Sequence, residues 1–164
     1  MILIFGVFTV RFEELENLPK FAEYSGFPLI PYKVLVINLG EDEKVSGIRI
    51  KSIKQREISY KLDFALPVDT PGSQTPKTYL PQTYPKEIVF VGNQGFFRGN
   101  RLAFIIVSAI HIRNGRTYLN EEVSFEVIKS KENLRFSRPR YSDDRIWGGT
   151  FKLLGISKYQ TSSF

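Results

Sequence analysis

The sequence predicts an all-β fold in which antiparallel sheets form a jelly-roll-like β-sandwich, with a long proline-rich loop and an extended C-terminal tail. Several short segments alternate apolar and polar residues with a period of two, which is typical of half-buried strands. The chain also contains fourteen Phe and eight Tyr against a single Trp and a single Met, and aromatic residues favour strands. No segment has a convincing long helical pattern.

Length and composition indicate a single globular domain and exclude several kinds of chemistry. We place the sandwich at residues 1–131 of the 164 and a basic linker with an apolar tail at 132–164. The chain has no cysteine and one histidine. A disulfide scaffold, a thiol nucleophile and a thiolate metal site are therefore excluded, and a histidine-based catalytic dyad lacks its parts. We expect no catalytic residue, no metal and no cofactor.

No apolar run approaches the roughly 18 residues that a membrane span requires, so we expect no membrane partner. The segment Met1–Val10 is apolar, but no basic region precedes it and no small-residue cleavage site follows it. It is therefore predicted as a first strand rather than as a signal peptide.

Turn signals divide the N-terminal half into short elements. The segment 26–31 reads Gly-Phe-Pro-Leu-Ile-Pro, and its two prolines predict an edge element. Ile48 and Ile50 alternate with charged neighbours and so predict a half-buried strand. The other predicted elements of this half are a strand at 7–12, a loop at 13–23, a strand at 34–39, a turn at 40–43 and a strand at 45–52.

The C-terminal half continues the β pattern around one irregular segment. Asp69–Lys86 contains four prolines and is predicted as a long loop. Asn114-Gly115 is a strong signal for a type I′ hairpin, and Val123, Phe125 and Val127 form the apolar face of a closing strand. The other predicted elements are a period-two segment at 58–64 and an apolar strand at 102–112 that continues to the hairpin.

The segment Tyr84–Arg101 combines several constrained backbone positions. It reads Tyr-Pro-Lys-Glu-Ile-Val-Phe-Val-Gly-Asn-Gln-Gly-Phe-Phe-Arg-Gly-Asn-Arg. Tyr84-Pro85 favours extended structure at its start. Gly92, Gly95 and Gly99 are predicted to allow positive φ or a close approach of the backbone.

This segment resembles the signature of the N-terminal propeptide domain of gingipain-type cysteine peptidases. In that family a Tyr-Pro-x-Glu strand leads into a Gly-x-x-Gly-Phe-x-Arg-Gly-x-Arg turn. The resemblance covers nearly the whole chain. Further segments similar to the family are 26–31, 40–50, the hairpin at 114–115, and the junction that precedes the catalytic domain at 141–144 and 151–154.

The resemblance implies a prodomain that precedes a cysteine-peptidase catalytic domain, helps it to fold and in some members keeps it latent. The expected partner is then the catalytic domain of the same polypeptide, which would carry the catalytic histidine and cysteine. The resemblance also implies a secreted or cell-surface protein.

The proline-rich loop Asp69–Lys86 is the strongest candidate for partner binding, because loops on a rigid sandwich commonly present binding residues. Lys77 is its most central basic residue. With Thr78 and Tyr79 it is a candidate to enter the specificity pocket of a peptidase that prefers basic side chains. A solvated surface loop is the alternative interpretation.

Three further residues could have either a functional or a structural role. Arg98 and Arg101 are candidates for recognition, but an arginine after a glycine turn commonly donates to backbone carbonyls and fixes the turn. His111 falls within the predicted strand 102–112, where we expect a structural or surface role rather than a catalytic one.

The formal charge of +6 does not predict nucleic-acid binding. Residues 129–145 hold six basic and three acidic side chains, the signs are mixed elsewhere, and no ribonucleoprotein-type motif is present. Within this stretch Arg140 and Arg145 are the candidate cleavage sites, since Arg138 is protected by Pro139. The apolar residues from Trp147 onward either fold back on the sandwich or contact a partner.

Two functions from different classes remain open. The first is the prodomain of a gingipain-like cysteine endopeptidase, acting as a folding assistant and inhibitor. The second is a free-standing adhesive or carbohydrate-binding sandwich, which would need an exposed aromatic platform. An enzyme within this chain has little support.

Overall fold

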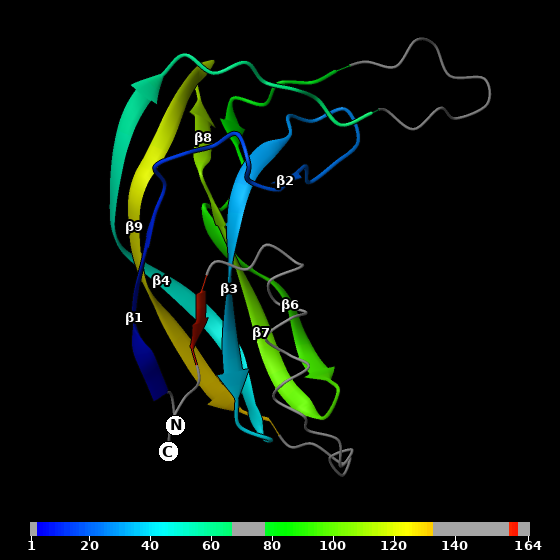
Figure 1. Ribbon diagram of the computed structural model, residues 1–164, viewed down its shortest axis with the longest axis vertical. Coiled ribbons are helices and arrows are strands. Elements are labelled where there is room, and N and C mark those ends of the chain that lie inside the picture. The colour runs from blue at the N-terminus through cyan, green and yellow to red at the C-terminus, as the bar shows by residue number, and fades with distance from the viewer. Residues whose placement is uncertain (1–2, 67–77, 133–157, 161–164) are drawn as a thin grey trace, which may run out of the picture.

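The computed structural model describes residues 3–66, 78–132 and 158–160. These residues form strands, turns and loops and contain no helix, hence none that would cross a bilayer. Figure 1 shows the strands running along the long axis of the molecule. Their bounds are β1 Leu3–Arg11, β2 Lys20–Phe21, β3 Ile30–Leu39, β4 Glu43–Ile58, β5 Thr83–Tyr84, β6 Val89–Phe97, β7 Asn100–Ser108, β8 Ile110–Arg113, β9 Arg116–Lys131 and β10 Lys158–Gln160.

The strands form two five-stranded sheets. In the first, β4 pairs along one edge of the sixteen-residue β9, while β1 and β8 share its other edge and β5 lies beside β8. In the second, β7 lies between β6 and β3, and β3 is bordered on its other side by β2 and β10. All pairs are antiparallel except β10 with β3. The predicted all-β sandwich with antiparallel sheets is therefore confirmed.

The core lies between the two sheets. From β9, the side chains of Val123, Phe125 and Val127 are fully buried, as their alternation predicted. They pack with buried residues of β1, β3 and β7, and the Phe8 and Phe125 rings stack at 5.9 Å. Burial of each such side chain contributes about 1.5–3 kcal/mol, so this alternation is a main source of stability.

The predicted strand 102–112 is wrong as a single element. The chain leaves one sheet at the end of β7 and enters the other at β8, with buried Ala109 between them. The Ala109 N–H donates to the Pro31 carbonyl and its carbonyl accepts from the Asn120 N–H, both at 2.8 Å. Because these backbone groups are satisfied across the crossing, an unbroken apolar run accommodates a change of sheet.

The hairpin at residues 114–115 is confirmed. It joins β8 to β9 with Arg113 opposite Arg116. Asn114 and Gly115 have φ values of 53° and 75°, and positive φ at both central positions defines a type I′ turn.

The predicted burial of Ile50 is wrong, although its strand exists. Ile48 packs against the core, but Ile50 is 42% exposed. Register shifts on β4 occur between Val45 and Gly47 and between Ile50 and Ser52. Ile48 and Ile50 pair with Val127 and Phe125 without a shift between them and so share one face of β4, which the core covers at Ile48 but not at Ile50.

Several predictions for the loops need correction. Residues 59–64 keep the alternating burial of the period-two pattern but are not part of a sheet beyond a bridge from Phe64 to Pro28. Short strands β2 and β5 occur where continuous loops were predicted. Of the predicted edge element 26–31, residues 26–29 lie outside the strands, and Ile30 and Pro31 begin β3, where they pair with β2 before the pairing with β7 begins at Tyr32.

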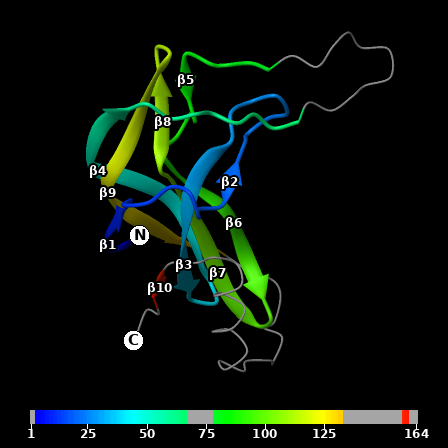
Figure 2. The ribbon, with the colours of Figure 1, turned by 45° about the horizontal axis from the view of Figure 1, so that its top comes forward.

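The C-terminal tail contributes β10, which pairs in parallel with residues 35–37 of β3 (Figure 2). The apolar stretch from Trp147 to Ile156 lies outside the described residues.

Candidate partner-binding site

The segment 25–27 holds both described stems of the proline-rich loop. The Gly26 N–H donates to the Ala65 carbonyl at 3.1 Å, and the Tyr79 N–H donates to the Gly26 carbonyl at 2.9 Å. The Ala65 N–H also donates to the Phe27 carbonyl at 2.9 Å, and Ser25 Oγ donates to the Leu66 carbonyl at 2.8 Å. Gly26 has a φ of 79°, a conformation that favours glycine at this junction.

The Phe27 ring is the centre of an aromatic cluster at the loop stems. Its centroid lies 5.1 Å from that of Tyr24, 5.4 Å from that of Tyr79 and 5.5 Å from that of Tyr84. Tyr84 is buried, its hydroxyl accepts from the Glu23 N–H at 2.8 Å, and burial raises the pKa of its phenol. Tyr84 therefore anchors the cluster to the core, while Tyr24 and Tyr79 lie at its surface.

The predicted binding residues fall partly within the described structure. Thr78 and Tyr79 are exposed immediately after the segment 67–77, whereas Lys77 lies outside the described residues. The predicted cleavage sites Arg140 and Arg145 also lie outside them. Sequence reasoning missed Tyr24, Phe27 and Leu66, because Tyr24 and Phe27 lie far before the loop in the sequence and no local signal connects them with it.

The signature segment forms β5, the β6–β7 hairpin and the chain between them. Tyr84 belongs to β5, which pairs with β8, and the Tyr84-Pro85 peptide bond is cis. Arg98 and Gly99 occupy the two turn positions with φ values of 48° and 84°. The prediction of positive φ is thus confirmed for Gly99 at a type I′ turn.

The other two glycines of this segment differ from each other. A Cβ built on Gly92 would lie 2.4 Å from Ile106 Cδ1, so the Ile106 side chain would have to shift to admit another residue there. A Cβ on Gly95 would meet nothing within 4 Å, and its φ is not positive. The prediction of a constrained backbone at Gly95 is therefore wrong, because this residue faces open space.

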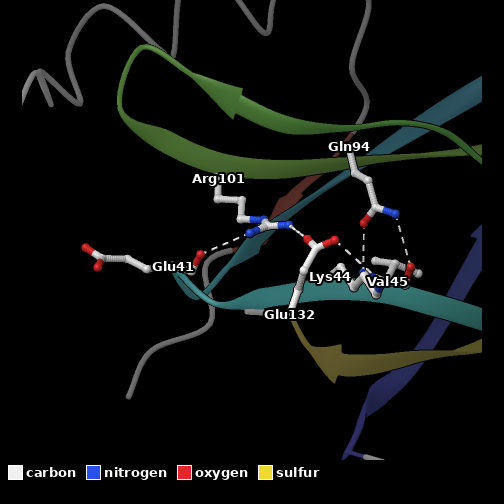
Figure 3. A network of polar contacts seen from close by, with 6 residues as sticks. All are labelled: Glu41, Lys44, Val45, Gln94, Arg101 and Glu132. Atoms are coloured by element: carbon white, nitrogen blue, oxygen red, sulfur yellow. Dashed lines mark hydrogen bonds and ion pairs between the residues drawn. The ribbon is translucent and has the colours of Figure 1, made fainter. Parts of the chain in front are cut away.

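Arg101 is the buried centre of a polar network at the β6–β7 hairpin (Figure 3). Its Nη1 donates to the Glu41 carbonyl at 3.0 Å, and its Nη2 donates to Glu132. Lys44 Nζ lies 3.6 Å from the same carboxylate. The Arg101 guanidinium lowers the pKa of the Glu132 carboxyl through this hydrogen bond. The contact with the Glu41 carbonyl is the kind of turn-fixing bond predicted for an arginine in this segment.

Two side-chain amide contacts continue this network into β4. Gln94 Oε1 accepts from the Val45 N–H at 2.8 Å, and Gln94 Nε2 donates to the Val45 carbonyl at 3.1 Å (Figure 3). Arg98 is exposed beside the network, with its guanidinium 6.0 Å from the Phe97 ring centroid. The network joins both sheets at this end and leaves Arg98 to solvent.

His111 is half-buried on β8, opposite Tyr118 of β9. Burial lowers the pKa of its imidazole, and the nearby Arg113 guanidinium lowers it further. No group of three or more potential ligands that would hold a metal occurs among the described residues.

A groove of about 760 Å³ lies between β1 and β3, away from the loop stems. Charged side chains border it, and those of Arg11 and Glu122 pair with each other at 2.6 Å. Lys33 donates to the Arg11 carbonyl at 2.6 Å. These groups satisfy one another, so the loop stems remain the better candidate for a partner.

Comparison with known proteins supports the fold. No protein-family model and no curated protein matches the sequence. A chain from the complex of Porphyromonas gingivalis RgpB pro- and mature domains has a TM-score of 0.55 at 11% identity, with 93% of this chain and 95% of that chain covered. A structure on the zymogenic latency of gingipain K from Porphyromonas gingivalis has a TM-score of 0.54 at 15% identity, with 80% and 93% covered. At these identities the likeness shows a shared fold, which is the fold expected from the sequence resemblance.

Proposed function

We propose that this chain is the prodomain of a gingipain-like cysteine endopeptidase, which assists folding of the catalytic domain and inhibits it until cleaved. The observation that carries the proposal is the fold shared with a chain from a complex of gingipain pro- and mature domains, over 93% of the present chain. The absence of cysteine and the single histidine agree with a non-catalytic region. The parent protein is expected to be secreted or to lie on the cell surface.

The proline-rich loop is the proposed inhibitory element. Its two stems are hydrogen-bonded to the same backbone segment, so both ends of the loop are held in fixed positions. Ends held in this way reduce the entropy lost when a loop enters a cleft. We place Lys77 in the specificity pocket of the catalytic domain, with Thr78 and Tyr79 beside it.

Release follows from cleavage of the basic linker. Arg140 and Arg145 are the proposed sites, and both suit a peptidase that selects basic side chains. Their substitution together by Gln should keep a linked prodomain attached, whereas substitution of Arg138 alone should not. Fragment masses from the processed protein would identify the cleaved bonds.

Inhibition in trans tests the proposal. The isolated chain should release nothing from casein or basic peptides, because it lacks a nucleophile and a base. It should inhibit the purified mature enzyme, and Lys77→Ala should weaken inhibition by about tenfold or more without changing the melting temperature. Full activity of the enzyme in a large excess of the chain would reject inhibition, and a refolding assay would then test folding assistance alone.

A further inference from the structure

Four apolar side chains at the loop stems are exposed although they lie beside a well-packed cluster. We call this set the apolar collar. Its members and their exposed fractions are Tyr24 65%, Leu66 89%, Tyr79 59% and Leu80 45%. Three of them adjoin the segment 25–27, through the Phe27 ring or, for Leu66, through a hydrogen bond from the Ser25 hydroxyl to its carbonyl, and Leu80 follows Tyr79. They therefore gather at one place from three parts of the sequence.

The sandwich does not need these side chains for its own core. The cluster beneath them is already filled by buried Ile30, Tyr84, Ile110 and Ile112. Exposed apolar groups that gather on a surface commonly mark a site of interaction. The collar thus indicates a contact surface rather than an incomplete core.

Backbone hydrogen bonds make the collar and the loop stems one unit. Tyr79 N–H donates to Gly26, and Ala65 exchanges hydrogen bonds with Gly26 and Phe27. Leu29 N–H further donates to the Asp63 carbonyl at 2.7 Å. A partner that contacts the loop beyond these stems consequently approaches the collar as well.

The size of a stable interface also points to the collar. A specific protein interface uses about 20–30 residues on each side. The segment between the described stems, residues 67–77, supplies eleven. A partner that holds this loop tightly must therefore contact residues beside its stems, and the collar is the apolar surface found there.

Resting on the proposed function, we propose that the apolar collar docks on the rim of the substrate cleft of the cognate catalytic domain. The collar supplies affinity, whereas the loop supplies specificity for the cleft. Contacts near the centre of such an interface commonly carry most of its affinity, and tyrosine is enriched among them.

The orientation of the aromatic rings indicates that the collar binds a protein surface rather than a sugar. The Tyr24 and Tyr79 ring planes are inclined to that of Phe27 by 68° and 42°. Because these inclinations differ, the rings do not form one flat stacking platform. The two leucines add apolar area without the hydrogen-bonding groups that a sugar would require.

The test compares two triple variants as inhibitors of the purified mature catalytic domain. The collar variant carries Tyr24→Ala, Leu66→Ala and Tyr79→Ala. The control variant carries Val7→Ala, Ile50→Ala and Phe97→Ala, which remove three other exposed apolar side chains. We expect the inhibition constant of the collar variant to rise by about tenfold or more. That of the control should change by less than about threefold.

The outcomes distinguish a failure of the collar inference from a failure of the proposed function. If the wild-type chain neither binds nor inhibits the enzyme, the proposed function fails. If the wild-type chain inhibits and the collar variant inhibits equally well, the collar inference alone is overturned. Melting temperatures verify folding, and the single variant Tyr24→Ala replaces the triple variant should the latter unfold. Glycan binding that the wild-type chain shows and the collar variant loses would instead support the carbohydrate-binding alternative.

Discussion

The two ends of the sandwich connect the two sheets through different kinds of contact. The loop stems and the β6–β7 hairpin lie at opposite ends of the sandwich (Figure 1). At the end that carries the loop stems, backbone hydrogen bonds and the Phe27 cluster hold the chain, and apolar side chains remain exposed. At the end that carries the β6–β7 hairpin, the buried guanidinium of Arg101 joins the Glu41 carbonyl to Glu132 (Figure 3). Both ends connect the two sheets.

The difference shows which end is available for a partner. At the hairpin end Arg101 and Lys44 pair with Glu132, so a partner would have to break these pairs before binding. Phe96 and Phe97 are 40% exposed there, which is less than any member of the collar. The loop end satisfies its backbone groups internally and leaves apolar surface free, so a partner gains by covering it. We therefore assign stability to the hairpin end and recognition to the loop end.

Arg101→Leu gives the largest expected effect. It removes both guanidinium hydrogen bonds, the one to the Glu41 carbonyl and the one to Glu132. We expect a loss of about 2–3 kcal/mol in the free energy of unfolding, measured by urea denaturation. Inhibition of the mature enzyme by the folded fraction should stay unchanged. Weaker inhibition at unchanged stability would assign recognition to the hairpin end and reverse the comparison.

Arg98→Ala is the matched control for this change. Arg98 belongs to the same hairpin but is exposed, so its replacement should alter the free energy of unfolding by less than about 0.5 kcal/mol. Equal losses at Arg98 and Arg101 would show that general hairpin charge, rather than the buried network, stabilises this end.

Gly99→Val should have the next largest effect. The φ of 84° at Gly99 places the residue in a region that a β-branched side chain adopts only with strain. We expect a loss of about 1–3 kcal/mol, seen as a lower melting temperature. Gly95→Ala provides the comparison and should be nearly neutral, because its added Cβ meets open space. An unchanged melting temperature in Gly99→Val would indicate that the hairpin turn contributes little to stability.

The sequence predicted those elements whose signals are local. The alternation of Val123, Phe125 and Val127 and the Asn114-Gly115 turn each follow from residues within a few positions of one another. The change of sheet at Ala109 and the bulges near Ile50 depend on which strands become neighbours. Local patterns do not contain that information, so these features could not be predicted.

The features of the candidate site likewise divide into local ones, which could be predicted, and long-range ones, which could not. The glycine-constrained hairpin turn at Gly99 was predictable from the sequence, whereas the centre of the proline-rich loop lies outside the described residues. The contact of Phe27, which packs against Tyr24, with Tyr79 about fifty residues later in the sequence requires the fold. The partner of Arg101 is likewise Glu132, 31 residues away. The proposal that one end recognises a partner and the other stabilises the fold therefore depends on long-range contacts.

The two ends should also lose stability in different ranges of pH. At the hairpin end the pKa of Glu132 is lowered below its usual value near 4.5, through its hydrogen bond with Arg101. Its contribution is present above that value and is lost as the pH falls through the lower folded-state pKa. His111 lies on β8, adjacent to the β5 strand that contains Tyr84. The two groups therefore test different ends.

The His111 effect is the smallest that we expect and the most selective. Its folded-state pKa lies below the ordinary value of 6.5, because burial and Arg113 disfavour the imidazolium. As the pH falls below about 6.5, His111 becomes protonated in the unfolded chain but stays neutral in the folded chain. The free energy of unfolding therefore declines until the pH reaches the folded-state pKa. His111→Gln should remove this decline between pH 7.5 and 5.5, measured as the change in melting temperature across that range. The Glu132→Gln variant should retain this decline. In the wild type the Glu132 carboxyl stays ionised throughout that pH range, so it does not cause the decline. Equal declines in wild type and His111→Gln would mean that His111 does not cause the loss, and the loop end would then contain no group that responds to mild acid through this mechanism.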